Sequence, residues 1–83
     1  YPNPFSDQIT LAFHLEINSL VQVAIYDLSG KIIRQLVNEY RTSGSQTVVW
    51  DGKDTFGKEM PAGFYFYEIS TNDQKIQQKV IKL

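Results

Sequence analysis

The chain has 83 residues, with eight lysines and arginines against nine aspartates and glutamates, one histidine and no cysteine. A net charge of −1 argues against a nucleic-acid-binding module, and the missing cysteines exclude a disulfide framework and a thiolate zinc site. No apolar run approaches the ~20 residues that span a bilayer, so we expect no membrane span. The length predicts a single domain over residues 1–83, and the absence of an initial methionine indicates a piece of a longer protein.

The first part of the chain alternates apolar and polar side chains with a period of two, which predicts β-strands over 8–17 and 20–27. Their inward-facing residues are Ile9, Leu11, Phe13, Leu15, Ile17, Val21, Val23 and Ile25. The Pro2-Asn3-Pro4 opening predicts an extended lead-in that packs Tyr1 or Phe5 against the core. Asp27 and Gly30 occupy the first and fourth positions of a segment that is typical of a type I turn.

The stretch 31–40 alternates poorly, and its spacing also fits a short helix. We favour a strand that carries a bulge or is buried on parts of both faces, because its neighbours are strands. Gly44 then breaks the chain, and 46–50 is expected to form a short strand that ends at Trp50.

The segment 64–71 has the strongest strand propensity of the chain, and two phases compete within it. One phase ends in a charge and is assigned to the outside: Phe64, Phe66 and Glu68. The other phase is assigned to the core: Tyr65, Tyr67 and Ile69. A two-residue hairpin at Asn72-Asp73 leads into the last strand, 75–83.

Six to seven antiparallel strands without a confident helix predict an all-β sandwich. Its core is expected to contain one residue in two from separate strands: Ile9, Leu11, Phe13, Val21, Val23, Ile25, Trp50, Tyr65, Tyr67 and Ile69. The segment Trp50-Asp51-Gly52 is expected to end a strand in an Asx-type turn, with the Asp51 carboxylate accepting backbone N–H groups.

Several short segments, in this order and spacing, resemble the C-terminal sorting domain of type IX secretion in Bacteroidetes and related bacteria. They are Tyr1–Phe5, Ile25–Gly30 with Ile33–Leu36 after it, Val49–Asp54 with Gly57 after it, Gly63–Tyr65 and Lys79–Leu83. The chain is also similar to the immunoglobulin-like domain of the flagellar hook-capping protein, which carries the same Trp-Asp-Gly and Gly-x-Tyr segments.

This resemblance implies an immunoglobulin-like β-sandwich at the C-terminus of a secreted protein, covalently linked to an upstream passenger. It implies that the outer-membrane translocon reads the domain after the cargo reaches the periplasm, and that a sortase-like peptidase often removes it. The passenger is then secreted or held at the cell surface. The sorting-signal candidates are Pro2, Asn3, Pro4, Gly63, Tyr65, Lys79, Val80, Ile81, Lys82 and Leu83. In the last strand, Val80 or Ile81 is expected to anchor the chain while Lys79 and Lys82 face the partner.

Two other functions stay open at this point. Phe64 and Phe66 form a candidate surface patch, so the domain could be a carbohydrate-binding or stabilising accessory module of an extracellular glycoside hydrolase or other enzyme. A structural assembly role like that of the hook cap is the other alternative.

Asp51 and Asp54 are weak calcium candidates, because they lack the acidic ligand run of an EF-hand. We expect no metal, no cofactor and no catalysis, since the lone His14 and the carboxylates form no recognisable catalytic set.

Overall fold

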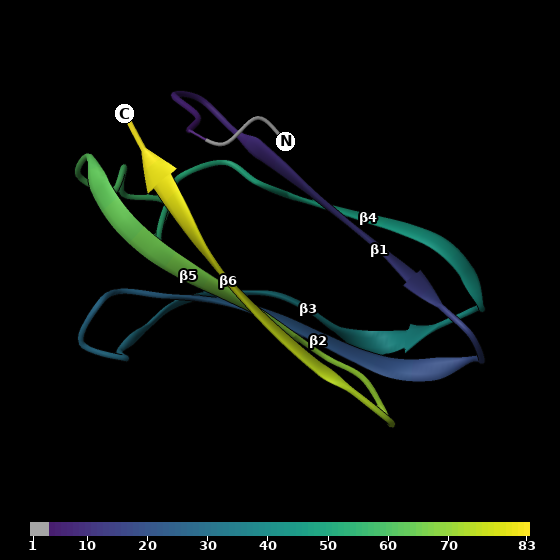
Figure 1. The fold of residues 1–83 in the computed structure, drawn as a ribbon. Helices are drawn as coiled ribbons and strands as arrows, with labels where there is room; N and C mark the ends of the chain where they lie inside the picture. Colours follow the sequence, from purple (N-terminus) through teal and green to yellow (C-terminus); the bar gives the residue numbers. More distant parts are fainter. Residues whose placement is uncertain (1–3) are drawn as a thin grey trace.

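The computed structural model describes residues 4–83, which form six β-strands and no helix (Figure 1). The strands are β1 (Ile9–Leu15), β2 (Ser19–Tyr26), β3 (Ile32–Arg41), β4 (Gly44–Trp50), β5 (Gly63–Ser70) and β6 (Lys75–Lys82). One sheet has the order β3-β2-β5-β6 and the other pairs β1 with β4, all in antiparallel register. The predicted all-β antiparallel sandwich is confirmed. Because no helix forms, none of the described residues builds a helix that could cross a membrane.

The first strand is shorter than the sequence pattern predicts. It ends at Leu15, and Ile17 lies in the connection to β2 with 56% of its surface exposed. The alternation continues beyond the strand, but the chain must turn there because β1 and β2 belong to different sheets. The expected burial of Ile17 is therefore wrong.

The third strand owes its irregular apolar pattern to two register shifts against β2. Val23 faces Val37 while Ala24 faces Gln35, and Ile25 faces Arg34 while Tyr26 faces Ile32. Each shift leaves one residue of β3 unpaired in the ladder, which moves the side chains that follow to the other face. The strand with a bulge is confirmed for this segment, and the helical alternative is wrong.

The fifth strand has the predicted phase. Tyr65 and Ile69 are buried between the sheets, and Tyr67 is half-buried against the same core. Phe64, by contrast, exposes 47% of its surface on the outer face of the four-stranded sheet. Two of the expected core residues, Phe13 and Tyr67, are only partly buried and lie at the margin of the core. The other expected core residues are buried: Ile9, Leu11, Val21, Val23, Ile25, Trp50, Tyr65 and Ile69.

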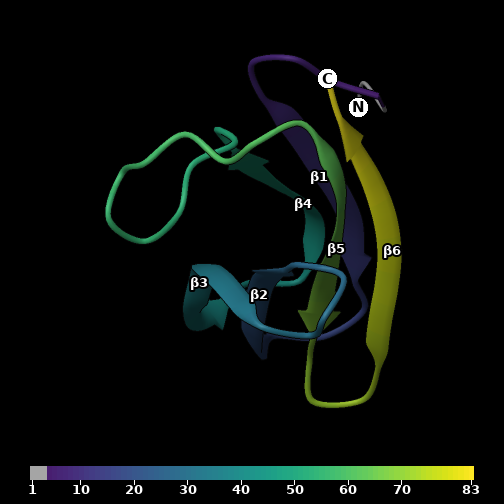
Figure 2. The same cartoon turned by 90° about the vertical axis from the view of Figure 1, so that its left-hand side faces the viewer.

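Three aromatic rings pack against one another in the part of the core that lies at one end of the sandwich. Trp50 lies between Phe5 and Tyr65, with ring centroids 5.5 and 5.4 Å away. Its indole N–H donates to the Lys53 carbonyl oxygen at 2.9 Å, so the one polar atom of this side chain is satisfied. The Tyr65 hydroxyl donates to the Pro61 carbonyl oxygen at 2.6 Å. These two bonds tie the 51–62 loop, visible as the wide green turn in Figure 2, to the core.

Two turns share the sequence Asp-x-x-Gly-Lys and the same hydrogen bonds. In the first, the Gly30 N–H donates to the Asp27 carbonyl oxygen, and the Asp27 carboxylate accepts the N–H groups of Ser29 and Lys31 at 2.9 and 3.0 Å. The segment that starts at Asp54 repeats these bonds, with both its glycine and Gly30 at a positive φ. A short acidic side chain and a glycine at fixed spacing therefore specify both turns.

The Asp27 turn gives a pH-dependent contribution to stability. The Ser29 hydroxyl, followed by the backbone N–H groups of Lys31 and Ser29, lowers the pKa of Asp27 from its usual 3.8. Because the pKa is lower in the folded chain, this contribution is present above about pH 4 and is lost as the pH falls through the folded value.

We expect the Asp27→Asn variant, which keeps an acceptor oxygen but does not titrate, to lose less stability than the wild type on acidification. Urea unfolding midpoints at about pH 6 and about pH 3 measure this difference, because carboxylates titrate in that range. Equal losses in the two proteins would contradict this role of the carboxylate.

Candidate functional site

The N-terminal segment and the end of β6 meet at one edge of the four-stranded sheet. Phe5 forms a parallel β-bridge with Lys82. The Phe5 N–H donates to the Ile81 carbonyl oxygen at 3.0 Å, and the Leu83 N–H donates to the Phe5 carbonyl oxygen at 2.8 Å. In Figure 2 the purple start of the chain lies beside the yellow end of β6. Pro4 directly precedes this bridge and is exposed, whereas Pro2 and Asn3 lie outside the described residues.

Sequence reasoning placed Phe5 in the lead-in to the first strand but not among the site residues. An isolated bridge has no periodicity that could reveal it, and its partner lies at the other end of the chain. The one available signal was an aromatic residue after two prolines, which suits an extended segment with a buried anchor.

The side chains at the end of β6 alternate between the core and the outer face. Val80 is buried in the core, which confirms it as an anchor. Ile81 is half-buried and pairs in register with Phe64 on the outer face. The Lys79 ammonium lies 5.2 Å from the centroid of the Phe64 ring, a cation–π contact. Leu83 follows the strand and is exposed.

Lys82 does not face outward as expected. It exposes only 6% of its surface, because it shares the inward phase of Val80. Its aliphatic part lies against Gly52, and its ammonium reaches Glu59 at 3.3 Å, near the surface. The long stem of a lysine permits this, since it packs as an apolar chain while the charged end stays close to water. Lys82 therefore holds the 51–62 loop to β6 rather than presenting its charge to a partner.

Gly63 and Tyr65 belong to the same region of the fold. They face Lys82 and Val80 across the β5–β6 ladder. Gly63 begins β5 with a φ of +149°, a conformation that favours glycine. Burial, with a smaller contribution from Asp27, raises the pKa of Tyr65, so its hydroxyl remains a hydrogen-bond donor at neutral pH. The described sorting-signal candidates thus gather at one end of β5 and β6.

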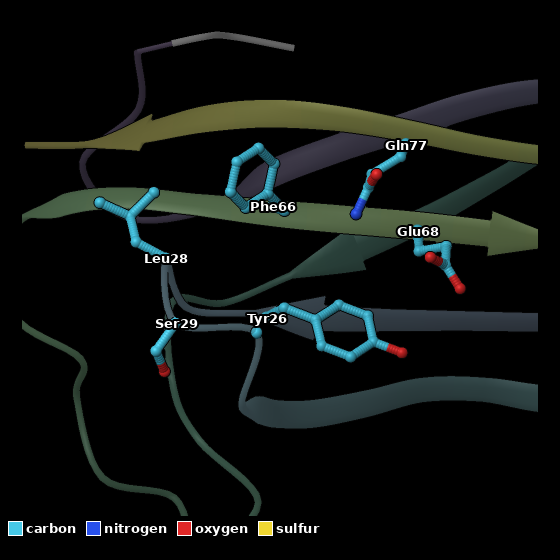
Figure 3. Close-up of a pocket in the computed structure, with 7 residues that line it drawn as sticks. Tyr26, Leu28, Ser29, Phe66, Glu68 and Gln77 are labelled. Carbon is cyan, nitrogen blue, oxygen red and sulfur yellow. The ribbon is translucent and has the colours of Figure 1, made fainter.

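The outer face of the four-stranded sheet carries a shallow groove of about 390 Å³ (Figure 3). Tyr26 and Phe66 form its apolar floor, with Leu28 at one end and Glu68 and Gln77 at the other. Phe64 lies on the same face. The structure therefore places both residues of the candidate surface patch on the outside.

The two calcium candidates take part in local structure. The Asp51 carboxylate accepts a hydrogen bond from the Arg34 guanidinium at 2.5 Å and one from the Lys53 N–H at 3.1 Å, as expected for an Asx-type turn. Asp54 holds the turn described above. No three acidic or histidine side chains of residues 4–83 gather as a metal site. Calcium would have to displace hydrogen bonds that already stabilise these turns.

Comparison with known proteins identifies the family of this domain. The sequence profile described as the secretion system C-terminal sorting domain matches residues 1–83, the entire chain. The chain belongs to this family. It is therefore a sorting signal of type IX secretion, a domain that the secretion machinery recognises. A comparison with curated protein sequences finds no match.

Solved structures share the fold of this sorting domain. Dimeric latent PorU from Porphyromonas gingivalis is 21% identical with a TM-score of 0.80, over 100% of this chain and 9% of that one. FlgD from P. aeruginosa is 28% identical with a TM-score of 0.71, over 90% of this chain and 59% of that one. FlgD from Xanthomonas campestris, described in connection with hook capping, is 22% identical with a TM-score of 0.71. The match covers 95% of this chain and 58% of that one.

The sorting domain spans less than two thirds of each of these relatives. The expected relationship to sorting domains is confirmed, and so is the expected likeness in fold to FlgD. Neither the family match nor these structures support the carbohydrate-binding or stabilising accessory module.

Proposed function

We propose that this sorting domain directs a covalently linked upstream passenger from the periplasm through the outer-membrane translocon of type IX secretion. A sortase-like peptidase then acts at the junction, and the passenger reaches the cell surface or the medium. The match of the family profile over the whole chain supports this proposal. We also propose that the sandwich acts as a signal and not as an enzyme. The contact of its one histidine with Glu16 at an exposed strand end, and the turns held by the Asp51 and Asp54 carboxylates, support this proposal.

The segment that the translocon reads is Lys79–Leu83, with Pro2, Asn3, Pro4, Gly63 and Tyr65 as further parts of the signal. The observation that carries this proposal is the position of β6 at the edge of its sheet. An edge strand lets a partner add a strand and read alternate side chains. Val80 fixes the strand in the core, while Lys79 and Leu83 lie on the outside. The Phe64 and Phe66 patch on the adjoining face is proposed as a further contact surface.

Removal of Lys82 and Leu83 should stop export while most of the core remains folded, because neither residue belongs to the apolar core cluster. The experiment fuses the domain to a fluorescent passenger in a bacterium with type IX secretion and compares periplasm with medium. Lys75→Ala is the matched control, since Lys75 is an exposed lysine at the opposite end of β6. A thermal melt of the truncated domain verifies folding.

Export of the truncated fusion at the level of the intact one would show that the end of β6 is not the signal. Retention of the intact fusion in the periplasm would instead contradict the proposed route itself.

A further inference from the structure

The edge that the proposed function assigns to a partner is already occupied at one point by the chain's own N-terminal segment. Among residues 4–83, Phe5 alone forms a β-bridge on the side of β6 that faces away from β5. It occupies the Ile81 carbonyl and the Leu83 N–H, two of the backbone groups that an added strand would use. A partner strand and Phe5 therefore compete for the same groups.

We propose that Pro4–Ser6 is a latch that covers the end of the β6 edge and must leave it before a partner can add a strand there. The inference rests on the proposed function, because it concerns access to the same signal. Under the proposed function the upstream passenger is joined to the domain through Pro4–Ser6. A pull on this junction therefore acts directly on the end of β6, which carries the signal.

The contacts of the latch suit a segment that opens separately from the rest of the fold. Its described backbone makes an isolated bridge with two hydrogen bonds, whereas β5 and β6 pair in register over the full length of both strands. Pro4 and Ser6 are exposed, so one side chain, Phe5, anchors the segment by packing against Trp50.

Opening the latch leaves the sheet intact. Val80 and Tyr65 pair opposite each other in the β5–β6 ladder, and none of the pairs of that ladder involves Phe5. The opened state exposes the Ile81 carbonyl and the Leu83 N–H in extended geometry, which an incoming extended peptide pairs with by strand addition. The occupant of the opened edge is thus a β-strand of the secretion machinery.

Amide hydrogen exchange of the 83-residue chain tests whether the latch opens locally. We expect the Leu83 amide to exchange faster than the amides of the β5–β6 ladder by about tenfold or more, where tenfold corresponds to about 1.4 kcal/mol. Phe5→Leu, which keeps an apolar anchor, should raise the Leu83 rate selectively, and Phe5→Ala should raise it further. Exchange of Leu83 only at the rate of global unfolding overturns the latch.

A covalent lock tests whether opening is needed for export. The Leu83 N–H bonds to the carbonyl oxygen that directly precedes Ser6, so cysteines at Ser6 and Leu83 lie within the ~7 Å reach of a disulfide. The chain has no other cysteine to interfere. We expect the oxidised Ser6→Cys/Leu83→Cys fusion to be exported about tenfold less than either single variant. A Thr71→Cys/Gln74→Cys pair, across the hairpin at the other end of β6, is the matched control.

Equal export of the locked fusion and the single variants overturns the latch. Export of the unmodified fusion is measured in the same experiment and tests the proposed function separately. If that unmodified fusion is not exported, the route fails while hydrogen exchange still decides whether the latch exists.

Discussion

Replacement of Trp50 by alanine is expected to destabilise the domain by about 3–5 kcal/mol, the usual cost of removing a buried tryptophan. Trp50 is 0% exposed and contacts both Phe5 and Tyr65. A domain of this size has a total stability of about 4–12 kcal/mol, so the variant is expected to be marginally folded. Urea unfolding followed by far-UV circular dichroism measures the change, because the variant has lost the only tryptophan.

Two further variants separate the causes of that loss. Trp50→Phe keeps an aromatic ring but removes the indole N–H that bonds to Lys53, so it should cost less than the alanine variant. Phe56→Ala is the matched control, because Phe56 is 93% exposed, and it should change stability by no more than about 0.5 kcal/mol. Similar losses at positions 50 and 56 would show that the aromatic cluster is not the centre of the core.

Gly52→Ala is expected to cost about 1–2 kcal/mol from backbone strain, plus a smaller cost for moving the flexible end of the Lys82 side chain. Gly52 has a φ of +78°, which favours glycine. A Cβ at this position would lie 2.7 Å from Lys82 Cε and 3.1 Å from Glu59 Oε2. The substitution therefore displaces the lysine that joins the 51–62 loop to the end of β6. Thermal or urea unfolding measures the effect.

Gly57→Ala provides the matched control for the backbone. Gly57 has nearly the same φ, +84°, but a Cβ there meets no atom within 4 Å. The excess cost at Gly52 over Gly57 therefore isolates the contact with Lys82. In a double-mutant cycle, Lys82→Ala should reduce the cost of Gly52→Ala, because it removes the side chain that clashes. Strictly additive effects would contradict a direct contact between these residues.

The parts of the fold that local patterns specify could be predicted from the sequence. Alternation along β2 and β5 identified the buried faces, since a strand has only two faces and one of them meets the other sheet. The Asp-x-x-Gly turn at Asp27 was recognisable because a side chain and a glycine only three residues apart determine it.

The features that join distant parts of the chain could not be predicted. Lys82 is buried because Glu59 and Gly52, in another loop, receive its ammonium and its stem. The bridge between Phe5 and Lys82 depends on where two ends of the chain meet, and neither end has a pattern that names its partner. The bulges of β3 were predicted in kind but not in position, because they depend on pairing with β2.

The bridge between the first and last segments also determines when the domain can fold. Phe5 and Trp50 remain without their full set of neighbours until β6 brings in Val80 and pairs with β5. Contacts this distant in sequence form slowly, because a long loop must close before any of them contributes. During synthesis on the ribosome, the β2–β3 hairpin can form early, but the hydrophobic core cannot close until β6 has emerged. The newly made chain therefore keeps an open sandwich until β6 has been synthesised, and the core closes only after that point.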